Sequence, residues 1–219
     1  MKIPSFCITE LYSKIKHLLP RNILLFYIQK GYLYLFLWYI WNWFIILLTD
    51  EEFEKIEKFY SIKFPQVLRL LYKSFLPEFY NWRDFSEENV SKIKYALNAP
   101  IEGIKFDIIH NNFWLEYFGE KTGNKENDLN KAVEYMTNAN EEEIPKLIPV
   151  YLHRYIPCFP DIIEVPVFSV HQTDIIYYGY NLEDYFEREF NKNFSYKNEN
   201  PDIGAKEVPF WSKIVEMNN

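Results

Sequence analysis

Histidines are the residues of this chain that could carry out acid–base chemistry near neutral pH. The sequence contains four of them: His17, His110, His153 and His171. Asp174 follows His171 by three residues, and a His–Asp pair can act as a general base. One chemical interpretation is therefore a hydrolase that uses His153 or His171 with Asp174. Another is a mononuclear metal site made from His110, His153 and His171.

The same residues have a structural interpretation, which we favour. His153 and Arg154 are expected to be largely buried, to hydrogen-bond to backbone groups or to Asp174, and to anchor a loop against a sheet. Asp174 falls in a stretch typical of a hairpin, where Asp bonds to its own backbone. We therefore assign His153, Arg154, Tyr155 and Asp174 to a structural motif, and predict no catalytic residue and no metal ligand.

Other catalytic and cofactor motifs do not occur in the sequence. It has no phosphate loop, dinucleotide fingerprint, nucleophile elbow, zinc pair or calcium loop, and six scattered glycines could not build a hidden one. We predict that the protein is not an enzyme and uses no cofactor. Cys7 and Cys158 cannot form a disulfide framework, which favours a reducing compartment and a cytoplasmic location.

Charge is distributed unevenly along the chain. Its 24 basic and 31 acidic residues give a net charge of −7. Residues 1–49 hold five basic residues and one acidic residue, so the remaining 19 basic and 30 acidic residues give residues 50–219 a charge of −11. Phosphate contacts need an excess of Lys and Arg, so we expect no nucleic-acid partner. A basic protein partner is the natural expectation.

A carboxylate-rich helix near the C-terminus is the segment we expect to meet that partner. Glu183, Asp184 and Glu187 lie on it, and Tyr177 precedes it on an aromatic strand. Acidic surfaces speed association with basic proteins. The alternative is that these carboxylates favour the positive end of the helix dipole and keep the helix soluble, while Tyr177 belongs to the core.

The first 47 residues form a hydrophobic extension of a different character. Residues 31–49 carry no charge, which reaches the lower limit for a membrane span. A membrane anchor through residues 31–48 is one interpretation, although its Trp residues crowd the middle of the run rather than its ends. A start of translation assigned too early, or an amphipathic or buried helix, are the others.

The remaining chain shows helical periods first and strand periods later. Thr49 and Glu52 form a capping box that begins a helix. A second helix is expected to begin at Pro65 and end at Pro77, and a third to begin at Ser86 and end at Pro100. Two more are expected over 128–139 and over 182–190, the last one capped by Asn181. Strands are expected over 103–109, within 111–119, over 147–152 at a sheet edge, and over 167–171 and 175–178 as a hairpin. The result is an α+β fold with a mainly antiparallel sheet flanked by helices.

Ordered sequence motifs in this part of the chain resemble the SUKH superfamily, which includes the Knr/Smi-type cell-wall assembly regulators. The motifs are TDEEFEKIE at 49–57 with Phe64-Pro65, NWRDF at 81–85, PIEGIKFD at 100–107, Phe113-Trp114, KLIPVYLHRYIP at 146–157, PVFSVHQTDIIYYG at 166–179, 182–190, and Phe210-Trp211-Ser212. They cover about three quarters of the chain, from Leu48 onward, and are ordered as in the bacterial branch of the superfamily.

This resemblance implies a SUKH-like domain over residues 48–219, with Trp82 and Trp114 among its structural motif residues. In bacteria, such domains look like immunity proteins that neutralise the cognate toxin of a polymorphic toxin system by covering it. The resemblance therefore implies a non-enzymatic binding protein. The alternative is a regulatory scaffold linked to cell-envelope or cell-wall synthesis.

Overall fold

The computed structural model describes residues 48–73, 80–159, 162, 164–190 and 204–218. Its helices are α4 (Asp50–Tyr60), α5 (Gln66–Tyr72), α6 (Glu87–His110), the 3-10 helix η1 (Glu116–Phe118), α7 (Lys125–Asn138), α8 (Leu182–Phe190) and α9 (Trp211–Asn218). Its strands are β1 (Leu147–Tyr151), β2 (Arg154–Pro157), β3 (Val167–His171) and β4 (Asp174–Gly179). All neighbouring strands pair antiparallel, in the order β1-β2-β3-β4. The predicted α+β class is confirmed.

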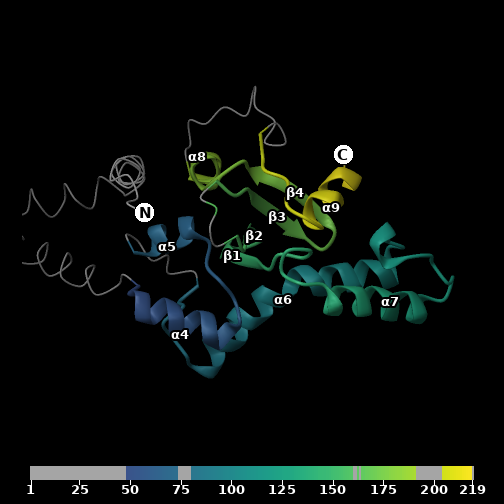
Figure 1. The fold of residues 1–219 in the computed structure, drawn as a ribbon, viewed down its shortest axis with the longest axis horizontal. Coiled ribbons are helices and arrows are strands. Elements are labelled where there is room, and N and C mark those ends of the chain that lie inside the picture. The colour runs from purple at the N-terminus through teal and green to yellow at the C-terminus, as the bar shows by residue number, and fades with distance from the viewer. Residues whose placement is uncertain (1–47, 74–79, 160–161, 163, 191–203, 219) are drawn as a thin grey trace, which may run out of the picture.

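Helix α6 is the longest of the described helices and runs beside the sheet, where it contacts β1 and β3 (Figure 1). Helix α4 lies near its N-terminal half, and α7 packs beside its C-terminal half. Helices α8 and α9 both contact β4. In the strand order, β1 is an edge strand, as Pro149 within it predicts.

The first helix begins where the sequence predicts. The Thr49 hydroxyl accepts a hydrogen bond from the Glu52 N–H at 3.2 Å, and the Glu52 carboxylate accepts one from the Thr49 N–H at 2.8 Å. This reciprocal pair satisfies two of the amide donors that a helix start leaves without partners. Before it, Leu48 is buried, and its N–H donates to the carbonyl of Tyr72 at 3.1 Å.

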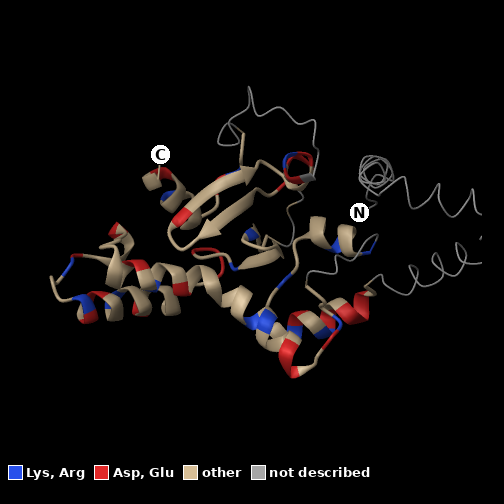
Figure 2. Ribbon diagram, turned by 180° about the vertical axis from the view of Figure 1, so that it is seen from behind, with Lys and Arg blue, Asp and Glu red and all other residues tan. Residues whose placement is uncertain are grey.

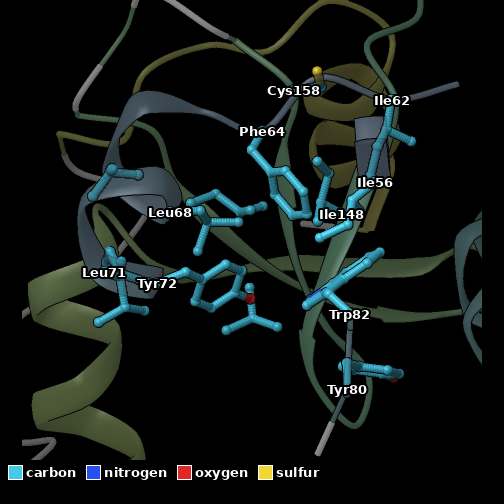
Figure 3. Packing of buried hydrophobic residues seen from close by; sticks show 14 of the residues in the cluster. Ile56, Ile62, Phe64, Leu68, Leu71, Tyr72, Tyr80, Trp82, Ile148 and Cys158 are labelled. Carbon is cyan, nitrogen blue, oxygen red and sulfur yellow. The ribbon is translucent and has the colours of Figure 1, made fainter. Parts of the chain in front are cut away.

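One hydrophobic cluster joins α4, α5 and the N-terminal half of α6 to one face of the sheet. Trp82 is fully buried in it, with ring centroids 5.0 Å from Phe64 and 5.6 Å from Tyr60 in edge-to-face geometry. Side chains of α4, α5 and β1 point toward one another in this cluster (Figure 3). Edge-to-face packing is the arrangement that aromatic quadrupoles favour.

A second hydrophobic cluster covers the other face of the sheet. Phe168 and Tyr177 stack on neighbouring strands with centroids 5.1 Å apart. Trp211, at the start of α9, is buried and its ring N–H donates to the Pro145 carbonyl at 2.7 Å. Helix α9, which was not among the predicted helices, therefore completes this cluster.

The expected end of α6 at Pro100 is wrong, because the helix continues to His110. Proline has no N–H, so Pro100 leaves the carbonyl of Ala96, four residues earlier, without its helical donor. The hydroxyl of Tyr155, buried on β2, donates to that carbonyl at 2.9 Å. A side chain from the sheet thus replaces the missing helical hydrogen bond.

The two strands expected over 103–109 and within 111–119 are also wrong. The first segment is the C-terminal half of α6, where a side chain at Gly103 would come 2.6 Å from the backbone of Gln172 in the β3–β4 turn. Asp107, one turn further on, is buried and accepts hydrogen bonds from the N–H and hydroxyl of Thr173 at 2.9 and 2.6 Å. Burial in this segment follows the helical period, since Ile104 and Ile108 are buried and Phe106 is exposed.

The second segment is a turn followed by η1. The ring N–H of Trp114 donates to the Gly119 carbonyl at 2.8 Å and closes it. Strand β2 was not predicted, since its four residues are too few to show a period. The helix over 128–139 is confirmed with an earlier start at Lys125, and the capped helix α8 and the 167–178 hairpin are confirmed.

Some expectations fall outside the described residues. Pro77 is one of them, although α5 ends at Tyr72 with Lys73 as its C-cap, earlier than the predicted end at Pro77. The hydrophobic extension over 1–47 is another, so the domain boundary at residue 48 stays a prediction. Among the described residues, no helix combines the length and apolar composition needed to cross a membrane.

A double-mutant cycle tests the role of Tyr155. Tyr155→Phe should lower the free energy of unfolding by about 2 kcal/mol, because it leaves the buried Ala96 carbonyl without a donor. In a Pro100→Ala background, where residue 100 regains its N–H, the same change should cost less than about 1 kcal/mol. Urea denaturation of the four proteins measures both costs. Equal costs in the two backgrounds would contradict the role.

Glu57 supports a second prediction, because it is a buried carboxylate held by three donors. It accepts from the Phe64 N–H at 2.9 Å, from Lys63 at 3.0 Å and from Arg69 at 2.7 Å. Burial alone would raise the pKa of Glu57, but these hydrogen bonds and charges outweigh it and hold the pKa below its usual 4.5. The ionised form therefore stabilises the loop between α4 and α5.

A depressed folded-state pKa gives stability that is complete above the unfolded pKa of Glu57 and is lost as the pH falls through the folded value. Glu57→Gln should lower the free energy of unfolding by about 3 kcal/mol at neutral pH, since it leaves buried donors poorly matched. The gap between the two proteins should narrow on acidification. Urea denaturation across this range measures it, with Glu54→Gln, exposed on the same helix, as the control.

Candidate partner-binding surface

Arg154, at the start of β2, is held by side chains from three other elements. Its Nε donates to Glu189 of α8 at 3.1 Å and its Nη1 donates to the Ser169 hydroxyl of β3 at 2.8 Å. The guanidinium lies 3.7 Å from the centre of the Tyr178 ring of β4. Only 12% of the Arg154 side chain is exposed. The expectation of a buried, hydrogen-bonded Arg154 is confirmed, with Glu189 and Ser169 as its partners instead of Asp174.

The corresponding expectation for His153 is wrong, since this side chain is exposed in the turn between β1 and β2. Desolvation and the adjacent Arg154 charge both lower the pKa of His153, so the ring is neutral at pH 7. Asp174 is exposed too, and its backbone lies opposite that of His171 in the register of β3 and β4. The His153 carbonyl accepts a hydrogen bond from the Val170 N–H at 2.9 Å, which joins the β1–β2 turn to β3.

One row of side chains crosses the sheet at the level of Arg154. Arg154 lies opposite Ser169 and Ser169 opposite Ile176, so the three share one face of the sheet. Ile176 is 42% exposed, and Leu152, in the turn two residues before Arg154, is 49% exposed. We call Leu152, His153, Arg154 and Ile176 the sheet-end surface. It contains two exposed apolar side chains, Leu152 and Ile176, and a largely buried Arg154 whose charge is paired with Glu189.

The backbone at Leu152 is strained. Its φ is 48°, in the left-handed region that glycine and asparagine adopt readily and that costs other residues about 1 kcal/mol or more. Gln172, in the neighbouring β3–β4 turn, has a φ of 56°. A large apolar side chain is therefore held out to solvent at a position where a small polar residue would be unstrained. Such strain tends to occur at functional sites.

On and near α8, the predicted acidic partner-binding helix, two of the predicted partner-binding residues contact other parts of the domain instead of solvent. Asp184 is buried, pairs with Arg188 at 2.7 Å and accepts from the Tyr180 N–H at 3.0 Å. Tyr177 is buried in the second hydrophobic cluster, and its hydroxyl is hydrogen-bonded to Ser212. Asp184 and Tyr177 therefore hold the fold and are not surface contacts. Glu183 and Glu187 remain on α8 at intermediate exposure.

The thiol of Cys158 is buried and hydrogen-bonded. Burial raises the pKa of the Cys158 thiol to about 11, so this cysteine is protonated at neutral pH and is a poor nucleophile. The thiol donates to the Lys63 carbonyl. Within the described residues, no three His, Cys, Asp or Glu side chains are grouped as a metal site requires.

Sequence reasoning missed Leu152 and Ile176 as surface residues. Both residues were only placed within expected strands, Leu152 at the end of 147–152 and Ile176 within 175–178. One signal in the sequence could have indicated a special role. Leu152-His153 lies between two short β-forming runs, where a two-residue hairpin turn would normally carry Gly, Asn or Asp instead.

Comparisons of the chain with protein families, with curated proteins and with solved structures found no match.

Substitutions at Arg154 and His153 should separate a structural from an exposed side chain. Arg154→Ala should lower the free energy of unfolding by about 3 kcal/mol, because Glu189 is left without its cation and the Ser169 hydroxyl without its donor. His153→Ala should change it by less than about 0.5 kcal/mol. Denaturant titration checks both. A similar loss in the two variants would show that the His153 ring also holds the fold.

Proposed function

We propose that this protein is a non-enzymatic binding protein with a SUKH-like fold that neutralises a cognate toxin, as immunity proteins of polymorphic toxin systems do. The support is threefold: the ordered sequence motifs, the acidic excess of residues 50–219, and the strained, exposed sheet-end surface. The toxin is a protein, and the domain acts by covering part of it.

The single observation that carries the binding role is Leu152. Its side chain is half exposed and is held at a backbone angle that glycine would adopt without strain, so the turn itself does not require a large apolar residue. Together with Ile176 it offers an apolar contact, and its neighbour Arg154 is fixed by Glu189, so binding would order little that is mobile. Apolar anchors surrounded by polar groups are typical of the energetic centre of an interface.

Charge supports the same role. Acidic and basic side chains occur together along α4 and α7, whereas the strands are mostly uncharged (Figure 2). The buried carboxylates Glu57, Asp107 and Asp184 are occupied by donors of the domain itself. Apart from these and the buried Asp128, the described carboxylates are at least partly exposed, where they attract a basic protein and speed encounter.

Co-expression tests the function. The full chain, produced together with the product of a neighbouring candidate toxin gene, should restore growth and copurify with that product. Leu152→Asn should weaken the complex by at least about tenfold in Kd, the effect of losing about 1.4 kcal/mol at an interface centre. The same variant should be at least as stable as the parent, since Asn tolerates the left-handed region.

Gln172→Asn is the matched control. It relieves a left-handed residue in the adjacent hairpin turn without removing an exposed apolar side chain, so it should restore growth as the parent does. Rescue by Leu152→Asn equal to that of the parent would remove the sheet-end surface from the proposal. Failure to neutralise any neighbouring candidate would remove the immunity function itself.

A further inference from the structure

A groove of about 430 Å³ is lined by residues of η1, α7, the segment before α9 and α9 itself. Its lining includes Tyr117, Tyr135 and Phe210, and the carboxylates Glu143, Glu207 and Glu216. We call it the acidic groove. It shares no residue with the sheet-end surface.

Three stacked rings line the groove. The Tyr117 and Tyr135 rings are nearly parallel, at 5° with centroids 5.9 Å apart, and Tyr117 lies 6.3 Å from Phe210 at 27°. Tyr117 is 42% exposed, so its ring is available to a ligand. Phe210 has a φ of 67°, an angle that is costly for a bulky residue. Aromatic rings attract cations through their quadrupoles.

Carboxylates surround these rings. Glu207 and Glu216 are exposed at the groove and, within the described residues, Glu207 makes no ion pair. Glu143 lies close enough to Tyr135 that burial and the Glu143 charge together raise the pKa of Tyr135. The groove thus has the two features that recognise a guanidinium, namely ring faces for stacking and carboxylates for pairing.

A cation of the protein already uses part of this site. Lys213 lines the groove and lies 3.3 Å from Glu216 and 3.9 Å from Glu116. Its hydrogen bond with Glu216 and the charges of both glutamates raise the pKa of Lys213. Even with this ammonium present, the lining carries more acidic than basic groups, so the charge is only partly compensated.

We propose that the acidic groove binds a basic segment of a protein partner, with an arginine side chain stacked on Tyr117 and paired with Glu207. The inference rests on the proposed function only in that the ligand is a protein. It does not depend on the sheet-end surface. Charge complementarity fixes the occupant as cationic, and the stacked rings favour the planar guanidinium over an ammonium group.

Hexa-arginine, hexa-lysine and hexa-glutamate peptides are suitable probes for the full-length protein. Isothermal titration at low and at physiological ionic strength should show the order Arg over Lys, with no binding of the acidic peptide. Tyr117→Leu should reduce the Arg-over-Lys preference by about threefold, because Leu removes the ring face while keeping an apolar side chain.

Three charge variants locate the binding. Glu207→Gln should weaken hexa-arginine binding by about threefold, the scale of one exposed ion pair. Lys213→Met should strengthen it by a similar factor, because it removes the competing cation. Glu54→Gln removes the same charge from an exposed site on α4 and should leave the affinity unchanged apart from a small effect at low salt.

Equal weakening by Glu207→Gln and Glu54→Gln would overturn the proposal, since it would show diffuse attraction to an acidic protein. Unchanged affinity in Lys213→Met would overturn it as well. The toxin assay stays separate. Peptide binding at the groove without growth rescue would disprove the proposed function alone, and rescue by Glu207→Gln and Tyr117→Leu with no peptide binding by the parent would disprove the groove alone.

Discussion

The hydrogen bond from Tyr155 to the carbonyl of Ala96 is the contact on which the domain's architecture depends. Pro100 would otherwise leave a buried carbonyl unsatisfied in the middle of α6. With the bond in place, α6 continues as one helix and contributes its first half to one hydrophobic cluster and its second half to the other. The same helix thereby links the hydrophobic clusters on the two faces of the sheet.

Buried carboxylates hold three loop segments of the domain through hydrogen bonds. Asp107 on α6 receives the β3–β4 turn through Thr173, and the contact is close because Gly103 carries no side chain. Glu57 holds the loop between α4 and α5, and Asp184 holds the start of α8. Each charge is matched by several donors, which is the condition under which burying a carboxylate stabilises a protein.

The sheet-end surface and the acidic groove are the two surfaces that we propose for binding. The sheet-end surface has apolar side chains, one of them at a strained backbone angle, and suits the centre of a protein interface. The acidic groove has rings and carboxylates and suits a cationic side chain. A partner with an apolar patch and a basic segment would fit both kinds of chemistry, and both surfaces differ from the α8 helix that composition alone pointed to, because Asp184 and Arg188 are used within the domain.

The sequence by itself determined the elements whose signals are local. Capping by Thr49 and Glu52, the α7 period, the β3–β4 hairpin and the α+β class all follow from neighbours within a few residues. Tertiary structure decided the course of α6 through Pro100 and the short strand β2, because the donor that makes the helix continuous lies 59 residues away on that strand. It also decided which acidic and aromatic residues reach solvent: Tyr177 and Asp184 are buried, and Leu152 and Tyr117 are exposed, since burial depends on which elements pack together and not on residue type.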